Sequence, residues 1–233
     1  MSELLSCEAL TKCYQKDKTA LENVDLHIGF GRIVGLLGPN GSGKTTLIKL
    51  ANGLLVPSSG AVTIDGHTPG PETKGLISYL PERTYLSGWM NVVQLLDFFG
   101  DFYPDFDRDA AEHMLSALDV SPRLRIKQMS KGTREKVQLI LVMSRKADLY
   151  LLDEPMGGVD PAARDYILDT IITNYNQEGS ILISTHLISD IENILDDVIM
   201  IKEGNVVCYD SADNIRMNYE KSLDQVFREV FRC

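Results

Sequence analysis

The sequence has no long hydrophobic run and carries less positive than negative charge. No stretch approaches the roughly 18 apolar residues of a membrane-spanning helix, and the first residues are acidic and polar where a secretory signal would be hydrophobic. We therefore expect a cytosolic protein. Its 23 Lys and Arg against 33 Asp and Glu give a net charge of −10. That balance excludes a protein that holds nucleic acid or anionic lipid through a broad basic surface.

Cysteine is also scarce. The four cysteines are scattered and form no C-x-x-C pair, which favours reduced thiols over a disulfide framework or a zinc site. Internal repeats and low-complexity segments are absent from the sequence as well. What remains is an ordinary globular composition, with 44% hydrophobic and 24% charged residues over 233 positions. Such a chain can bury a full core in one domain.

Strand and helix patterns divide the chain into parts and predict an α/β fold. Residues 1–81 and 146–210 are rich in short apolar runs with little alternation, among them 149–152 and 180–184. Such runs indicate a mixed β core around parallel strands buried on both faces. We expect an antiparallel β subdomain near the N-terminus. Residues 82–145 show helical spacing and predict a helical subdomain, and residues 211–233 predict a helical tail.

A glycine-rich turn lies between a predicted strand, 32–37, and a helix predicted from about Lys44 to Leu54. Residues 38–45 satisfy G-x-x-x-x-G-K-[ST], whose backbone N–H groups cradle phosphate beside a positive helix N-terminus. Lys44 is predicted to reach the β- and γ-phosphates of ATP, and the Thr45 hydroxyl to bind Mg²⁺. The motif predicts a P-loop NTPase. Its expected phosphate-site residues are Gly38, Pro39, Asn40, Gly41, Ser42, Gly43, Lys44, Thr45 and Thr46.

Two adjacent acids follow a second apolar strand, 149–152. Asp153 is predicted to hold Mg²⁺ directly or through water, and Glu154 to accept a proton from the attacking water. A solvated strand cap, or the start of a turn marked by Pro155, is the alternative interpretation. Because strand-terminal carboxylates that face a P-loop are a recurring arrangement, the pair favours ATP hydrolysis.

Further motifs follow in a fixed order, and the whole set resembles the ATP-binding subunits of ABC transporters. Met129–Thr133 resembles the signature L-S-G-G-Q, Gly157–Asp160 the D-loop, and Ser184–His186 the switch-histidine motif. Tyr14 resembles the aromatic residue that stacks on adenine. The resemblance spans residues 4–209 and implies an ATPase that powers a separate transmembrane subunit.

The resemblance also implies roles for single residues. Ser130, Lys131 and Gly132 open a predicted helix whose N–H groups would meet the γ-phosphate of a nucleotide held by a second subunit, with Asp160 nearby. Ser130 also fits a plain helix N-cap. His186, as a neutral imidazole, would bind the γ-phosphate and position the water.

Tyr14 keeps two interpretations. Its ring can stack on a base, or it can be an ordinary core or strand tyrosine.

Two positions depart from the family pattern. Glu82 stands where the Q-loop glutamine is expected. It could bind Mg²⁺ or sense the nucleotide, although it adds negative charge and loses an amide donor. Lys131 replaces a signature glycine, either as a cation that attracts phosphate or as a solvated residue. Both forms resemble stand-alone bacterial subunits that serve exporters of antibiotics, bacteriocins, small peptides or lipid-like cargo.

The resemblance implies protein partners. A transmembrane permease subunit would dock on the helical subdomain and bring the chain to the inner face of the cell membrane. A second ATP-binding subunit, identical or not, would complete a sandwich around two Mg·ATP. Six aromatic residues between Trp89 and Phe106 form either an interface patch or a small core, and Trp89 and Tyr85 are our interface candidates.

Three other functions share part of this pattern. A non-transport ATPase of the superfamily would carry a coiled-coil insertion or a second nucleotide domain, which this sequence lacks. A small-molecule kinase would need the P-loop but not Ser130, Gly132, Asp160 and His186 in this order. A purely regulatory nucleotide switch would not need Glu154.

Overall fold

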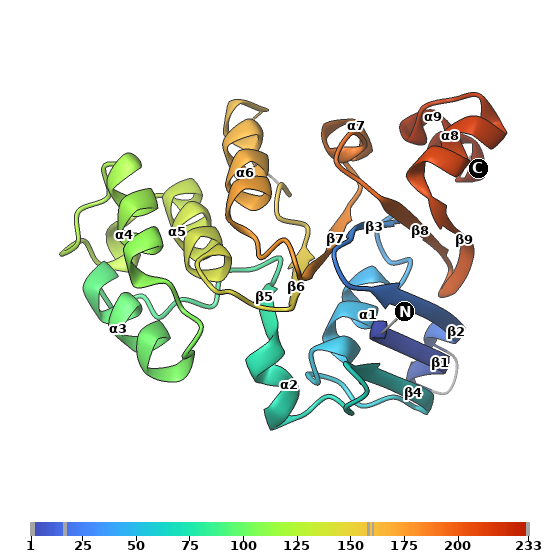
Figure 1. Cartoon of the computed structure of the whole chain (residues 1–233), viewed down its shortest axis with the longest axis horizontal. Helices are drawn as coiled ribbons and strands as arrows, with labels where there is room; N and C mark the ends of the chain where they lie inside the picture. Colours follow the sequence, from blue (N-terminus) through green and yellow to red (C-terminus); the bar gives the residue numbers. More distant parts are fainter. Residues whose placement is uncertain (1–2, 16–17, 158, 160, 232–233) are drawn as a thin grey trace.

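Six strands form the central sheet of the computed structural model, which describes residues 3–15, 18–157, 159 and 161–231 (Figure 1). They run in the order β5-β6-β7-β3-β8-β9, with the first five parallel and β9 antiparallel to β8. The parallel arrangement brings the carboxyl ends of β3, β6 and β7 to one edge of the sheet. Their bounds are β3 (Ile33–Leu37), β5 (Ile77–Leu80), β6 (Leu149–Asp153), β7 (Ser180–Thr185), β8 (Asp197–Lys202) and β9 (Asn205–Ser211).

A second, antiparallel sheet lies beside the first. Its order is β2-β1-β4, with β1 (Glu3–Gln15), β2 (Lys18–Gly29) and β4 (Ser59–Ile64). Helix α1 (Lys44–Ala51) packs between the two sheets, because Leu47, Ile48 and Leu50 join the buried residues of both in one apolar cluster. The start of α1 is therefore held by a rigid core on two sides.

Four helices cover the opposite face of the central sheet. They are α6 (Pro161–Asn174), α7 (Ile188–Ile191), α8 (Ala212–Tyr219) and α9 (Leu223–Val230). Their buried side chains, among them Ile167, Ile188, Ile215 and Val226, form one cluster with Tyr150 and the neighbouring strand residues. Helix α2 (Pro71–Leu76) leads into β5 at the sheet edge.

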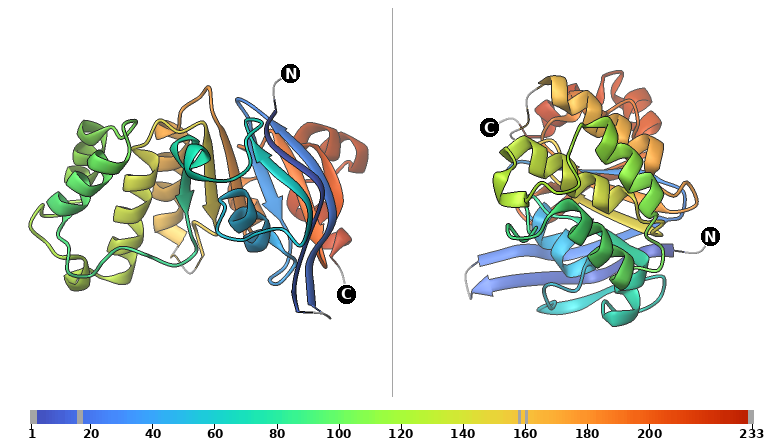
Figure 2. Two further views of the ribbon diagram at one scale, coloured as in Figure 1. Left: turned by 90° about the horizontal axis from the view of Figure 1, so that it is seen from below. Right: turned by 90° about the vertical axis from the view of Figure 1, so that its left-hand side faces the viewer.

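Three more helices lie together at one end of the molecule (Figure 2). They are α3 (Val92–Phe102), α4 (Arg108–Ala117) and α5 (Lys131–Met143), with a 3₁₀ turn at Ile126–Gln128. They enclose an apolar cluster of their own, and α5 also joins the sheet cluster through Leu139 and Val142. None of the described helices is long and apolar enough to cross a membrane.

Buried Arg145 connects this helical end to the sheet. Its guanidinium donates to Asp105 at 3.0–3.1 Å and to the backbone oxygens of Gly75 and Ile77, and it lies 3.8 Å from the ring centre of Tyr103. The hydrogen bonds that the guanidinium makes to described residues thus all lie at the seam between the two parts.

The aromatic cluster divides between core and surface. Phe99 is buried, and Tyr103 and Phe106 pack against it half-buried. Trp89 and Phe102 remain 65% exposed. The cluster therefore supplies both a small core and an apolar surface.

Candidate active site

The turn between β3 and α1 requires glycine at two positions. A Cβ on Gly38 would lie 2.5 Å from the backbone oxygen of Ile201, and a Cβ on Gly43 would lie 2.5 Å from that of Ala20. Gly43 also has φ of 119°, a conformation that side-chain-bearing residues avoid. The loop is thus built from backbone packed against backbone, as a phosphate cradle requires.

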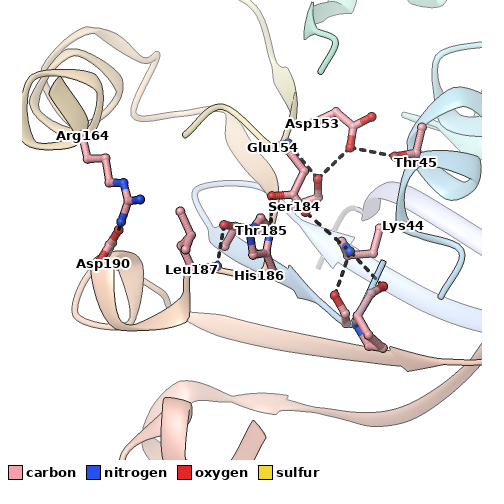
Figure 3. A network of polar contacts seen from close by, with 12 residues as sticks. Lys44, Thr45, Asp153, Glu154, Arg164, Ser184, Thr185, His186, Leu187 and Asp190 are labelled. Atoms are coloured by element: carbon pink, nitrogen blue, oxygen red, sulfur yellow. Dashed lines mark hydrogen bonds and ion pairs between the residues drawn. The ribbon is translucent and has the colours of Figure 1, made fainter. Parts of the chain in front are cut away.

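Lys44 lies buried inside this loop. Its ammonium donates to the backbone oxygens of Gly38 at 2.7 Å and Pro39 at 3.3 Å, and lies 3.5 Å from Glu154 Oε1 (Figure 3). That ion pair is not a hydrogen bond. Glu154 Oε1 is buried and forms no hydrogen bond with any described residue, and the same is true of Ser42 Oγ. Such orphaned buried oxygens are costly, and they mark the loop as a site that fits a polar ligand.

Asp153 lies at the carboxyl end of β6 and faces the loop. Its Oδ1 accepts hydrogen bonds from Thr45 Oγ1 at 3.1 Å and Ser184 Oγ at 2.8 Å. Burial raises the pKa of this carboxyl, and the two hydroxyl donors oppose the rise. Among the described residues, hydroxyls alone donate to this buried carboxylate, and that arrangement suits a cation between Asp153 and Thr45.

These two side chains fit Mg²⁺. The ion prefers oxygen ligands and takes one or two from protein while phosphate and water supply the rest. The described residues contain no group of three or more His, Cys, Asp or Glu that could hold a metal ion by themselves. A metal ion held by a nucleotide together with Thr45 and Asp153 agrees with both the ligand preference of Mg²⁺ and the absence of such a group among the described residues.

Glu154 and His186 form the second polar pair. Glu154 Oε2 lies 2.9 Å from His186 Nδ1, and the Glu154 amide donates to both the backbone oxygen and the hydroxyl of Ser184. Glu154 has φ of 50° and a side chain only 12% exposed, whereas that of His186 is 46% exposed. The turn after β6 thus directs the carboxylate back between Lys44 and His186.

Ser184 holds both acids, and the sequence did not single it out for this role. Its hydroxyl donates to Asp153 and accepts from the Glu154 amide. The pairing of Asp153 with Ser184 in the β6–β7 ladder brings them side by side. The sequence feature that could have indicated this role is the position of Ser184 at the end of a predicted strand, directly before Thr185 and His186.

Tyr14 lies over the same cleft. Its hydroxyl is 3.2 Å from Thr46 Oγ1, and its ring is half exposed. The cleft has a volume of about 450 Å³ and is lined by Tyr14, the loop, Glu82 and Glu154. Lys18, Thr19 and Ala20 also line it, and the sequence patterns did not mark them.

The residues of the signature-like motif lie elsewhere. Ser130 caps α5, accepting from the Thr133 amide at 3.1 Å, and the side chain of Lys131 is 72% exposed beside Glu135. A cavity of about 440 Å³ is lined by Ser130, Lys131 and Gly132, and no described residue of the P-loop contributes to it. One chain therefore does not bring Ser130 and Lys44 into one site. Asp160 lies outside the described residues.

A third cavity, of about 560 Å³, spans the seam between the two regions. It is lined on one side by Asn40, Glu154 and His186 and on the other by Lys131, with Glu82 between them.

The sequence from the second strand to the D-loop decides the family. Residues 21–157 match the family model described as ABC transporter. The chain belongs to the ABC transporter family. Curated relatives of this ABC protein include an uncharacterised ATP-binding protein of Methanocaldococcus jannaschii, 34% identical over 96% of this chain and 84% of that protein. The SkfA peptide export ATP-binding protein SkfE of Bacillus subtilis is 30% identical, over 88% of both chains.

Solved ABC structures have the same fold. A structure described as the ATP-binding subunit of an ABC transporter superposes with a TM-score of 0.85 at 28% identity, over 98% of this chain and 100% of that one. A dimeric ATP-binding cassette in a post-hydrolysis state with ADP and phosphate has a TM-score of 0.77 at 20% identity, over 89% and 98% of the two chains. The predictions of the P-loop NTPase fold, the ABC family, and an ATP-hydrolysing transporter subunit are confirmed. ATP is its nucleotide, and the role of Mg²⁺ stays a prediction.

Proposed function

We propose that this ABC subunit hydrolyses Mg·ATP in a dimer and thereby drives a transmembrane exporter of a peptide, antibiotic or lipid-like cargo. The observation that carries the catalytic part is the convergence of Lys44, Asp153, Glu154 and His186 at the ends of adjacent parallel strands. The cargo class rests on the named peptide exporter among the relatives.

Glu154 is the general base in this proposal. A water molecule attacks the γ-phosphorus, the bond to the β,γ-bridging oxygen breaks, and the carboxylate accepts the proton of the water. The orphaned Oε1 of Glu154 supports this role, because it leaves one buried acceptor for the water while Oε2 contacts His186. His186 then orients Glu154 and the γ-phosphate.

Lys44, Thr45 and Asp153 hold the charged groups. The ammonium of Lys44 exchanges carbonyl partners for β- and γ-phosphate oxygens, which offer stronger charge-assisted hydrogen bonds. Thr45 and Asp153 would hold Mg²⁺, which when bound neutralises the charge that develops on the phosphates. Tyr14 stacks on adenine at the open mouth of the cleft, and Thr46 fixes its hydroxyl.

A second ATP-binding subunit completes the site. Ser130, Lys131 and Gly132 form an exposed helix N-terminus. Their cavity has no P-loop residue in its described lining, although Lys131 also lines the seam cavity that Asn40 reaches. This helix N-terminus is therefore available to the nucleotide of another chain. Asp160 of the D-loop is assigned to the same interface. Closure around two ATP and reopening after hydrolysis would supply the differential affinity that moves a partner.

The transmembrane subunit would dock on a groove between the sheet and the helical end. The groove has a volume of about 450 Å³, and its aromatic walls include Tyr79, Tyr85 and Tyr103. Its described lining has no acid, and its cations are Lys49, Lys74 and Arg83, together with Arg145, whose charge is already paired with Asp105. In a chain of net charge −10, that local excess favours an amphipathic helix with acidic side chains.

This contact would hold the chain at the inner face of the membrane, without lipid or nucleic-acid contacts of its own. The proposed parts are a core (1–81 and 146–210), a helical subdomain (82–145) and a tail (211–233). Co-purification of a membrane protein with the tagged chain tests the docking. Loss of the co-purified membrane protein in Tyr85→Ala supports docking in the groove, and its loss in Trp89→Ala supports docking at the exposed Trp89. Unchanged co-purification in both variants contradicts this docking surface.

The decisive catalytic test is Glu154→Gln. We expect turnover to fall by about 10² to 10⁴, with ATP binding retained and an ATP-bound dimer visible by sizing chromatography with Mg²⁺. The matched control is Glu203→Gln, since Glu203 also ends a strand with a left-handed φ, of 48°, but lies outside the cleft. Full turnover in Glu154→Gln would reject the base. A persistent monomer would reject a homodimer and favour two different subunits.

A further inference from the structure

The four-residue helix α7 starts two residues after His186. The Leu187 amide donates to Thr185 Oγ1 at 2.9 Å, and Ile188 and Ile191 are buried in the sheet cluster. A helix this short has little stability of its own. The direction in which His186 points therefore depends on what holds α7.

One side chain ties α7 to the segment that follows Glu154. Arg164, on α6, donates from its NH1 group to Asp190 Oδ2 of α7 at 3.0 Å (Figure 3). Its Nε donates to the backbone oxygen of Val159 at 3.3 Å. The two charged side chains are only about one-quarter exposed, at 26% and 25%. The guanidinium thus touches both chain segments that leave the catalytic strand ends.

The far end of α7 is held by the C-terminal helices. Arg216 of α8 donates to the backbone oxygen of Glu192, and the Asp224 amide at the start of α9 donates to the Glu192 carboxylate at 3.3 Å. Polar contacts therefore hold helix α7 on two sides. The contact from α6 lies next to the catalytic residues, and the contacts from α8 and α9 lie at the far end of the helix. Only the contact from α6 also reaches the Glu154 side.

We propose that Arg164 and Asp190 are positioning residues that keep His186 in register with Glu154. The inference rests on the proposed function, in which His186 orients Glu154. Besides the Ser184 contacts, two side-chain links join the segments that follow β6 and β7: the inner one is the 2.9 Å contact of His186 with Glu154, and the outer one is Arg164 with Asp190. Without the outer link, α7 keeps its apolar contacts and the polar contacts of Glu192 with the tail, but it loses the ion pair that holds it on the α6 side, and the inner contact loses its alignment.

Kinetics of the full chain test this. Arg164→Gln and Asp190→Asn should each lower kcat for ATP hydrolysis about tenfold while KM changes less than about twofold, because geometry and not binding is lost. The double variant Arg164→Gln/Asp190→Asn should lose no more than either single one. The control is Arg108→Gln, which removes a more exposed ion pair with Asp97 in the helical end and should leave kcat unchanged.

A double-mutant cycle with His186→Ala separates positioning from mere stabilisation. With radiolabelled ATP to follow the slow residual reaction, Arg164→Gln should cost nothing further once His186 is gone. An equal loss in both backgrounds overturns the proposal. If His186→Ala alone leaves kcat intact, it is the proposed role of His186 that fails, and the two failures are distinguishable.

A spectroscopic measurement does not depend on turnover. In ¹³C-histidine spectra, Arg164→Gln should shift the ring signals of His186, assigned by His186→Ala, and leave those of the other three histidines in place. Arg164→Lys, which keeps the charge, should restore part of the signal position. An unmoved His186 signal in folded Arg164→Gln overturns the proposal.

Discussion

Two lysines show how differently the two halves of the nucleotide site are built. The side chain of Lys44 in the P-loop is 6% exposed and surrounded by backbone oxygens, whereas that of Lys131 at the start of α5 is 72% exposed. The first half is anchored between two sheets and is organised before any ligand arrives. The second is a self-capped helix end on the surface.

The difference separates binding from turnover. A half-site fixed by core packing can hold a nucleotide within one chain, since its donors need no reorganisation. A half-site on an exposed helix acts only when another molecule is placed against it. We therefore expect substitutions in the P-loop to change the ATP affinity of the single chain. Substitutions at the α5 start should leave that affinity unchanged and lower the rate of the assembled dimer.

The largest expected effect is at Lys44. Lys44→Met should raise the Kd for ATP about a hundredfold, equal to about 2.7 kcal/mol, because charge-assisted hydrogen bonds to phosphate are lost. Titration calorimetry on the isolated chain measures it. Lys49→Met on the same helix, outside the cleft, is the control and should bind ATP normally. An unchanged ATP affinity in Lys44→Met would contradict the expectation that the buried half of the site controls nucleotide binding.

Ser130→Ala should have an intermediate effect. Removal of the N-cap should cost about 1 kcal/mol of unfolding free energy, and turnover should fall about tenfold through the lost hydroxyl. ATP affinity of the single chain should not change. Ser222→Ala removes the equivalent cap of α9, so denaturant unfolding should show a similar loss with normal turnover. Weaker ATP binding by monomeric Ser130→Ala would contradict the separation of the halves.

The smallest expected effect is at Glu82, which lies where the halves meet. Glu82→Gln should keep ATPase activity within about tenfold, because an oxygen ligand survives the change. The rate should be followed against Mg²⁺ concentration, with the exposed Glu72→Gln as control. Near-complete loss of turnover would show that the carboxylate itself is required.

Local patterns predicted the secondary structure around the site. The apolar runs at 149–152 and 180–184 became β6 and β7 within one residue, and the helix from Lys44 formed but ended at Ala51 and not near 54. Its early end follows from Gly53, whose φ of 63° closes the turn. Apolar runs bounded by glycine determine strands and turns through neighbouring residues, so a single sequence contains that information.

Contacts between distant segments were not predictable in the same way. Ser184 meets the acidic pair only because β6 and β7 are adjacent in register, and Arg164 reaches Asp190 across 26 positions. The residues around each of these side chains do not indicate which distant residue it contacts. The aromatic cluster shows the same limit, since the pattern could not tell buried Phe99 from exposed Phe102.

Trp89 is the only tryptophan of the chain and is 65% exposed. Indole emission shifts to shorter wavelength when water is removed from the ring, so the protein carries a native fluorophore at the edge of its helical end. Binding of a partner that covers this edge should shift the Trp89 emission to shorter wavelength, so no added label is needed. Binding of a partner at the C-terminal helices should leave the emission unchanged.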